Sequence, residues 1–221
     1  MKPILFNTDM VRAILDGRKT VTRRLVKPAP RKKSCTSMFN PATQQLVFYE
    51  RLGVGVWKAP YKIGDILYVR ETWKVYEASS AGCCTIEYKA GGKEKFNKIL
   101  ALPTAKGDWK PSIHMPKEAA RIFLRVKDVR VEHLQDITDE QAKSEGIRGF
   151  FIGMGESGYA VSAETNTFYD GPVGAFANLW NSTIPQSERD TYGWDANPWV
   201  WVIEFERISM EEVMKDANSC I

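Results

Sequence analysis

The sequence is short of the residues that bind metals or form disulfide frameworks. Its 221 residues include only two histidines, His114 and His133, and four cysteines, of which Cys83 and Cys84 are adjacent. No two cysteines have the C-x-x-C spacing of zinc sites, so we expect no metal site and no cofactor. Cysteines without a framework pattern are typical of a reduced compartment, and we expect the protein to be cytoplasmic.

The sequence also lacks long apolar runs and a strong excess of one charge. No stretch approaches the ~20 apolar residues that span a bilayer, and the first residues lack the apolar run and cleavage site of a signal peptide. We therefore expect no membrane partner. The net charge of +4 is compatible with a polyanionic partner, but most dedicated nucleic-acid binders carry a denser basic stripe. The composition, 43% hydrophobic and 26% charged, is that of a globular protein.

Alternation of apolar and polar residues is the strongest local pattern that is present. The strands that it predicts are residues 4–6, 20–26, 66–73, 83–89, 120–134 and 197–209, with a hairpin over 45–57. Capping residues and i, i+4 apolar spacing predict helices at 8–16, 136–147, 175–184 and 210–221. Strands outnumber helices, no repeat is visible, and we expect antiparallel pairing. The sequence therefore predicts an α+β protein, built as a small barrel or rolled sheet rather than a βαβ fold.

One glycine motif has the spacing of a nucleotide-cofactor loop but lacks its context. Gly153, Gly155 and Gly158 match the pattern G-x-G-x-x-G. A dinucleotide-binding loop needs a core strand before it and a helix after it, and the residues that follow this motif have no helical pattern. We interpret the motif as an ordinary loop within an irregular, glycine-rich stretch over 148–175.

The densest group of functional side chains is the stretch DGRKTVTRR at residues 16–24. Gly17 ends the predicted helix, so the cations stand where the chain turns into a new strand, whose alternation puts Thr22 and Arg24 on one face. A solvated basic turn, a nucleic-acid contact and a catalytic site are all compatible with this pattern. The catalytic interpretation rests on Lys19 and Thr22, because an amine whose pKa is lowered by burial can act as a base for a hydroxyl. The orienting carboxylate is not singled out among the 27 acidic residues.

Aromatic residues are a second set of candidates for nucleic-acid contact. Trp199 and Trp201 alternate onto one face of the last predicted strand, where core packing is the simpler interpretation and base stacking is the alternative. Trp194 lies before that strand in a loop, which favours a binding role more strongly. His114 is either a strand-edge residue or a contact to a phosphate or base. We interpret His133 as exposed or structural, without a role.

Four blocks follow one another in a distinctive order. They are ILDGRKTVTRR (14–24), IGDILYVRETW (63–73), VKDVRVEHLQDITDEQAKSEGI (126–147) and WVWVIEFERI (199–208). In order and character they resemble the ASCH-domain family of the PUA-like superfamily. The resemblance implies a single PUA-like β-barrel domain over 1–221, with a few short helices and with insertions at about 27–60, 76–112 and 148–175. Enlarged members of this kind are associated with bacteriophages and prophages, which implies the cytoplasm of a bacterium or of a phage-infected cell.

The resemblance also implies a catalytic site. Compact bacterial members of the family include an amidohydrolase that acts on N4-acetylcytidine and has a Lys, a Thr and a Glu in its site. Position by position, these correspond to Lys19, Thr22 and Glu145 in this sequence, which supplies the missing carboxylate. Arg24 matches an arginine suited to holding a carbonyl or anionic oxygen.

Two functions follow from the resemblance. The first is amide hydrolysis of an N4-acylated cytidine, with Lys19 as the base, Thr22 as the nucleophile and Glu145 orienting Lys19. The second is a non-catalytic RNA-binding module, or a ribonuclease, that uses the same basic cleft. The residues expected to contact the nucleoside or RNA are Arg18, Arg23, Arg24, Arg70, Trp73, His114 and Trp194.

Overall fold

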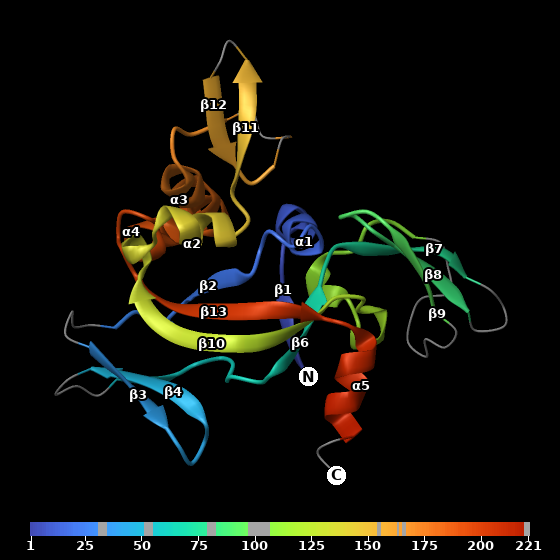
Figure 1. Ribbon diagram of the computed structural model, residues 1–221, viewed down its shortest axis with the longest axis horizontal. Coiled ribbons are helices and arrows are strands. Elements are labelled where there is room, and N and C mark those ends of the chain that lie inside the picture. The colour runs from blue at the N-terminus through green and yellow to red at the C-terminus, as the bar shows by residue number, and fades with distance from the viewer. Residues whose placement is uncertain are drawn as a thin grey trace. The chain divides into compact units, whose positions relative to one another are not determined.

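The computed structural model of the chain describes residues 1–30, 35–50, 55–78, 83–96, 107–153, 156–162, 164 and 167–218. The chain divides into two compact units. The first contains Met1–Asp16, Ile66–Arg125 and Arg207–Ile221, and the second contains Gly17–Asp65 and Val126–Glu206. The secondary structure is mixed α+β, with mostly strands and a few short helices, which confirms the class expected from the sequence (Figure 1).

The largest sheet has five strands in the order β1-β6-β10-β13-β2. Their bounds are β1 (Lys2–Leu5), β6 (Ile66–Arg70), β10 (Phe123–His133), β13 (Trp199–Ile208) and β2 (Val21–Leu25). β1 pairs with β6 in parallel, which corrects the expectation of antiparallel pairing; the long stretch between these strands supplies the crossover that parallel pairing needs. Within the described residues the sheets are not closed into a barrel.

Helix α1 (Thr8–Leu15) of the first unit begins and ends where the sequence predicts. Asn7 caps it, its Oδ1 accepting the backbone N–H of Met10 at 2.9 Å. Gly17 follows the helix with φ +72°, the left-handed conformation that stops a helix at low cost. The chain therefore leaves α1 abruptly, directly before the basic stretch.

The first unit also contains a three-stranded antiparallel sheet. Its strands are β7 (Trp73–Ala78), β8 (Cys84–Tyr88) and β9 (Lys93–Phe96), and β8 lies within the weak strand pattern that the sequence shows over 83–89. Trp73 and Ile86 of this sheet are buried in one hydrophobic cluster with Met115. Helix α5 (Met210–Asn218) adds Val213 to the same cluster, so the C-terminal helix is attached to this core by an apolar side chain.

The second unit contains two small antiparallel sheets. One consists of β3 (Cys35–Asn40), β4 (Gln45–Glu50) and β5 (Val56–Lys58), and β4 with β5 forms the predicted hairpin. The other is the hairpin of β11 (Arg148–Gly153) and β12 (Glu156–Ala160), which corrects the expectation of irregular structure there. Its glycines interrupt the alternation that identifies a strand, whereas cross-strand pairing forms it all the same. Both sheets lie in segments where the resemblance implies insertions.

The helices of the second unit are α2 (Asp139–Ser144), α3 (Pro172–Thr183) and α4 (Arg189–Tyr192). Thr138 begins α2 with a capping box, in which its Oγ1 accepts the N–H of Gln141 while the Gln141 side chain accepts the N–H of Thr138. Gly146, with φ +107°, ends the helix directly after Glu145. These two end points fix where the Glu145 side chain leaves the helix.

The aromatic residues of β13 pack against one residue of β4. Phe48 is buried, and its ring centroid lies 4.9 Å from that of Trp199 and 6.2 Å from that of Trp201. The two tryptophans therefore share a face of β13 and take part in packing, as the simpler interpretation predicted.

Candidate active site

The basic stretch after α1 is held in place by the end of α2 and by β13. Arg18 Nη1 donates to the carbonyl of Gly146 at 2.6 Å. The backbone N–H of Thr20 donates to the carbonyl of Ser144 at 2.9 Å, and the Thr20 carbonyl accepts the N–H of Phe205 at 2.8 Å. A solvated turn would not have its backbone and side chain tied to two other elements. The stretch is therefore a fixed part of the second unit.

Lys19 is a buried ammonium whose protons all have acceptors. Its side chain has no exposed surface. Nζ lies 2.5 Å from Glu145 Oε2, 3.0 Å from the Glu145 carbonyl and 2.8 Å from the Val21 carbonyl. An ammonium has three N–H donors, so these three acceptors match it in number. Of the three, only the carboxylate can accept the proton itself.

Glu145 receives cations on both carboxylate oxygens. Oε1 accepts from Arg23 Nη1 at 3.1 Å, while Oε2 accepts from Lys19. Only 3% of the Glu145 side chain is exposed, so its charge depends on these two partners instead of water. Removing either cation leaves the other in place.

Arg23 continues the network towards the surface. Its Nη2 donates to Gln141 Oε1 at 2.9 Å and lies 3.5 Å from Glu132 Oε2. Glu132 in turn binds Arg130 Nε at 2.5 Å. The exposed fraction of the side chains rises along this series from 0% at Arg23 to 21% at Glu132 and 29% at Arg130. Arg130 also contacts Asp128 and Glu204, so the network ends in a partly exposed cluster.

Burial and neighbouring charges lower the pKa values of two cations of this site. Burial lowers the pKa of Lys19 below its ordinary value; Glu145 opposes the shift, and the charges of Arg24 and Arg23 add to it. Burial also lowers the pKa of Arg24, against the influence of Tyr61 and Glu145. Three cations thus act on one buried carboxylate, and the cluster favours a further negative charge or a polarised oxygen.

Thr22 lies between Lys19 and Arg23 in the sequence. It is buried, with 3% of its surface exposed, and it pairs with Ile203 of β13. Alternation along β2 puts Thr22 on the face of Arg24 and opposite to Arg23. The strand therefore presents the hydroxyl and one guanidinium on one side, and the arginine that binds Glu145 on the other.

Two further predicted binding residues lie in the second unit. Arg18 binds the end of α2, as described above. Trp194 is half-buried, and its ring lies edge-on to Phe176 with centroids 6.2 Å apart. Its backbone N–H donates to Asn181 Oδ1 at 2.9 Å, so the loop that carries the indole is attached to α3.

The other three predicted binding residues belong to the first unit. Arg70 Nε donates to the Met115 carbonyl at 2.7 Å. Trp73 is 2% exposed and is part of the hydrophobic cluster of that unit. His114 is exposed and ends a short 3₁₀ turn, Ser112–His114. The catalytic residues taken from the resemblance and these three residues are thus in different units.

Sequence reasoning did not find the residues that surround Arg23 and Arg24. Thr138 and Gln141 have the spacing of a capping box, and that spacing does not indicate that the Gln141 side chain also accepts from Arg23. Glu132 lies in the alternating pattern of β10, which predicts that a charged residue faces the solvent. Tyr61 is far from Arg24 in sequence, and no local pattern connects the two.

Comparisons with known proteins give the site no precedent: no protein-family model, no curated protein and no solved structure matches the chain. Among the described residues, no three His, Cys, Asp or Glu side chains are grouped so that they can hold a metal ion. The helices in the described ranges are all too short or too polar to cross a membrane. The chemistry of the site therefore has to be inferred from its own geometry.

Proposed function

We propose that the protein is an enlarged ASCH-type member of the PUA-like superfamily, with a barrel built around the five-stranded sheet, and that it hydrolyses the acyl amide of an N4-acylated cytidine. The observation that supports this most is the buried contact of 2.5 Å between Lys19 Nζ and Glu145 Oε2. Thr22, three residues after Lys19 in the sequence, is also buried. Burial that lowers an amine pKa beside a specific carboxylate is typical of acid–base sites.

The proposed reaction uses the proton between Lys19 and Glu145. That proton moves to the carboxylate, and the neutral Nζ takes the proton of the Thr22 hydroxyl as Oγ1 attacks the acyl carbon. Lys19 then gives this proton to N4 of the cytidine while the C–N bond breaks. Water hydrolyses the acyl-threonine ester, which releases the carboxylic acid and restores the hydroxyl. Arg24 stabilises the oxyanion, a contribution of about 3 kcal/mol for one good donor.

A second candidate function is RNA binding or cleavage at the same place. The excess of cations over carboxylates around Lys19, Arg23 and Arg24 favours it, because phosphate is an anion. For single-stranded RNA, log K then falls with log salt with a slope of about −0.7 for each phosphate contact. Labelled RNA titrated at two salt concentrations measures this slope, and binding that is absent or insensitive to salt contradicts this candidate.

Substitutions at two threonines, Thr20 and Thr22, test the proposed hydrolase activity. Thr22 is buried in β2, whereas the Thr20 side chain is exposed on the same stretch. We expect wild-type protein to hydrolyse N4-acetylcytidine, Thr22→Ala to lose at least about 100-fold of the rate, and Thr20→Ala to retain it. Ultraviolet absorbance of the nucleoside follows the reaction, and thermal unfolding checks that both variants are folded.

Either of two results contradicts the hydrolase. One is a wild-type rate no higher than that of Thr22→Ala. The other is an equal loss in Thr22→Ala and Thr20→Ala, which would assign the effect to the local backbone and not to the buried hydroxyl.

A further inference from the structure

Arg23 of β2 has a guanidinium that is held by its two terminal nitrogens. The side chain is 0% exposed. Nη1 donates to Glu145 Oε1 at 3.1 Å, and Nη2 donates to Gln141 Oε1 at 2.9 Å. Nε is buried and has no hydrogen-bond partner in the part of the chain that the structure describes. The guanidinium is therefore fixed between the first turn of α2 and the residue that ends this helix.

The unpaired Nε of Arg23 indicates a role other than stability. A buried N–H without an acceptor costs free energy, because folding has removed its hydrogen bond to water. A buried ion pair is often no more stabilising than apolar residues of similar volume. What an arginine supplies here, and an apolar residue does not, is a positive charge and a planar fork that reaches two acceptors at once. Both act on Glu145.

Arg23 does not face the place where the proposed substrate reacts. Alternation along β2 puts Thr22 and Arg24 on one face of the strand and Arg23 on the opposite face. On the Arg23 face the strand meets α3, and the ring centroid of Phe176 lies 5.7 Å from Arg23 Cζ. A substrate held by Thr22 Oγ1 and Arg24 is therefore separated from the Arg23 guanidinium by the strand.

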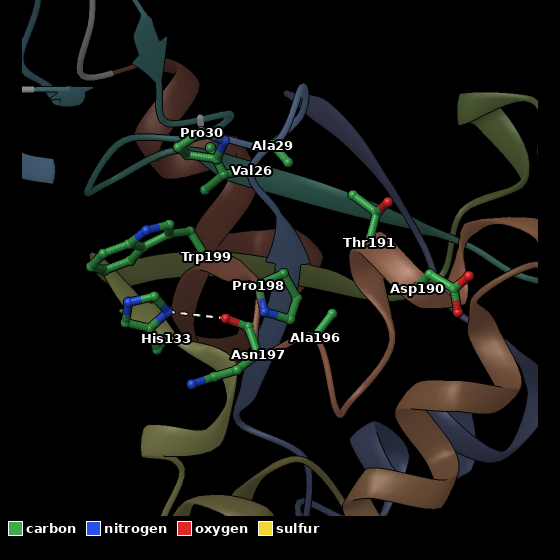
Figure 2. A pocket seen from close by; sticks show the side chains of 10 residues that line it. All are labelled: Val26, Ala29, Pro30, His133, Asp190, Thr191, Ala196, Asn197, Pro198 and Trp199. Atoms are coloured by element: carbon green, nitrogen blue, oxygen red, sulfur yellow. Dashed lines mark hydrogen bonds between the residues drawn. The ribbon is translucent and has the colours of Figure 1, made fainter. Parts of the chain in front are cut away.

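A cavity of the second unit is also lined without Arg23. Its volume is about 410 Å³, and it includes Val26, which directly follows β2. Figure 2 shows His133 and Trp199 on one side of this cavity and Asp190 on the other. Neither Arg23 nor a residue that it binds lines the cavity. A ligand bound there would therefore leave Arg23 without a contact to it.

The charges that act directly on Lys19 come from the end of α2 and from β2. Burial lowers the pKa of Lys19, Glu145 opposes this shift, and the positive charges of Arg24 and Arg23 add to it. Arg18 donates to the carbonyl of the residue that follows Glu145. Of these groups, Arg23 is the one that both binds the carboxylate and acts on the ammonium.

Further charged and titratable groups act on the two arginines. Glu132 of β10 lies 3.5 Å from Arg23 Nη2, and Tyr61 acts on Arg24. β13 pairs with β2 on its other side and places the apolar Val202 opposite Arg23. The surroundings of Arg23 thus combine two carboxylates, one amide and apolar side chains, and Glu145 is the carboxylate that it shares with Lys19.

We propose that Arg23 is the positioning residue of the Lys19–Glu145 pair: it binds Oε1 of Glu145 and so directs Oε2 towards Lys19. Gln141 holds the guanidinium in this place. The charge of Arg23 also makes the ammonium of Lys19 easier to deprotonate, which a residue with a purely structural role would not do. The kinetic consequence of this role rests on the proposed hydrolysis, whereas its effect on the Lys19 proton does not.

The first test follows the Lys19 proton and needs no activity. Nitrogen-15 NMR of the lysine side-chain amines gives the titration midpoint of Lys19, whose signal is identified by its loss in Lys19→Met. Arg23→Gln removes the charge and retains an N–H donor, and we expect the midpoint to rise by about one pH unit. Arg23→Lys retains the charge and should leave the midpoint near that of the wild type. Arg148→Gln, at an exposed arginine three residues after Glu145, is the matched control and should not move it.

The second test uses the hydrolysis of N4-acetylcytidine. We expect Arg23→Gln to lower kcat about tenfold at unchanged KM, because the carboxylate loses its fixed orientation while the contacts to the substrate remain. Arg23→Lys should recover part of this loss, since a single ammonium keeps the charge but lacks the fork. Arg148→Gln should have the kcat and KM of the wild type.

A variant outside Arg23 covers the case in which both Arg23 variants fail to fold. Gln141→Glu retains the capping box of α2, in which glutamate is an ordinary third residue. The new carboxylate competes with Glu145 for Arg23, and the Lys19 midpoint should again rise. Thermal unfolding checks that this variant and the others are folded.

The outcomes distinguish the role of Arg23 from the proposed reaction. An unchanged Lys19 midpoint in Arg23→Gln, or in Gln141→Glu where the Arg23 variants do not fold, overturns the proposal. A higher KM at constant kcat in Arg23→Gln also overturns it, because Arg23 would then contact the substrate. A wild type without hydrolytic activity contradicts the proposed hydrolysis instead, and the Lys19 titration then decides the role of Arg23.

Discussion

Two buried carboxylates, Glu71 in the first unit and Glu145 in the second, are paired in different ways. Glu71 binds one arginine through both oxygens, Arg121 Nε at 2.9 Å and Nη2 at 3.0 Å, and the guanidinium lies 4.0 Å from the ring centroid of Tyr88. Glu145 divides its oxygens between Lys19 and Arg23. Both carboxylates are nearly inaccessible, with 1% and 3% of their side chains exposed.

The two pairs differ in the kind of cation that meets the carboxylate, and the proposed reaction depends on this difference. An arginine stays protonated in proteins, so Arg121 keeps its charge beside Glu71; burial raises the pKa of the Glu71 carboxyl, and Arg121 opposes that shift. A lysine can lose its proton more easily when burial lowers its pKa, and burial lowers the pKa of Lys19 beside an acceptor. Burial alone therefore does not distinguish the two carboxylates; the identity of their cations does.

The largest expected effect on stability is at the Glu71 pair. Arg121→Leu removes the arginine that binds both oxygens of a buried carboxylate, and we expect the free energy of unfolding to fall by about 3–5 kcal/mol. The double variant Glu71→Leu/Arg121→Leu should recover most of this loss. Lys19→Met should cost less, because Arg23 still pairs with Glu145. Urea denaturation measures all three, and a larger loss in Lys19→Met contradicts the distinction between the two pairs.

A smaller effect is expected in the pH dependence of stability. Because burial lowers the pKa of Lys19 below 10.5, the unfolded chain binds this proton in a pH range where the folded chain has lost it. The free energy of unfolding of the wild type should therefore rise with pH through that range, relative to Lys19→Met. Urea denaturation of both proteins from about pH 7 to pH 10 gives the difference. A difference that falls with pH, or stays constant, refutes the lowered pKa.

The smallest effect is expected at the outer end of the network. Glu132→Gln weakens the link between Arg23 and Arg130, and we expect a loss of about 1 kcal/mol in stability and a several-fold lower kcat at unchanged KM. Glu206→Gln is the matched control, since its 3.5 Å pair with Lys127 is exposed, and no measurable change is expected. Equal effects in the two variants would show that the network does not position Glu145.

The regular elements around the site could be predicted because their causes are local. Gly17 stops α1, Thr138 caps α2, and the long alternating patterns gave β10 and β13. The parallel pairing of β1 with β6 and the β11–β12 hairpin could not be predicted in this way. Both depend on partners that single-sequence periodicity does not reveal.

Only part of the site could be predicted from the sequence. Lys19 stood out in the basic stretch itself, Glu145 came from the resemblance alone, and the structure places the two in contact. Alternation directed attention to Thr22 and Arg24, whereas Arg23, on the other face, is the arginine that binds Glu145. That contact joins residues 122 positions apart, so tertiary packing decides it. His133, which the sequence predicts to be exposed or structural, stacks on Trp199.

The most direct measurement is the hydrolysis of N4-acetylcytidine by the wild type, Lys19→Met and Lys143→Met. Lys143 is an exposed lysine of α2, two residues before Glu145, and its replacement removes the same charge without touching the buried pair. The proposed function predicts turnover by the wild type and Lys143→Met and a loss of about 100-fold or more in Lys19→Met. Equal rates in all three proteins would contradict it, because the buried amine would then take no part in the chemistry.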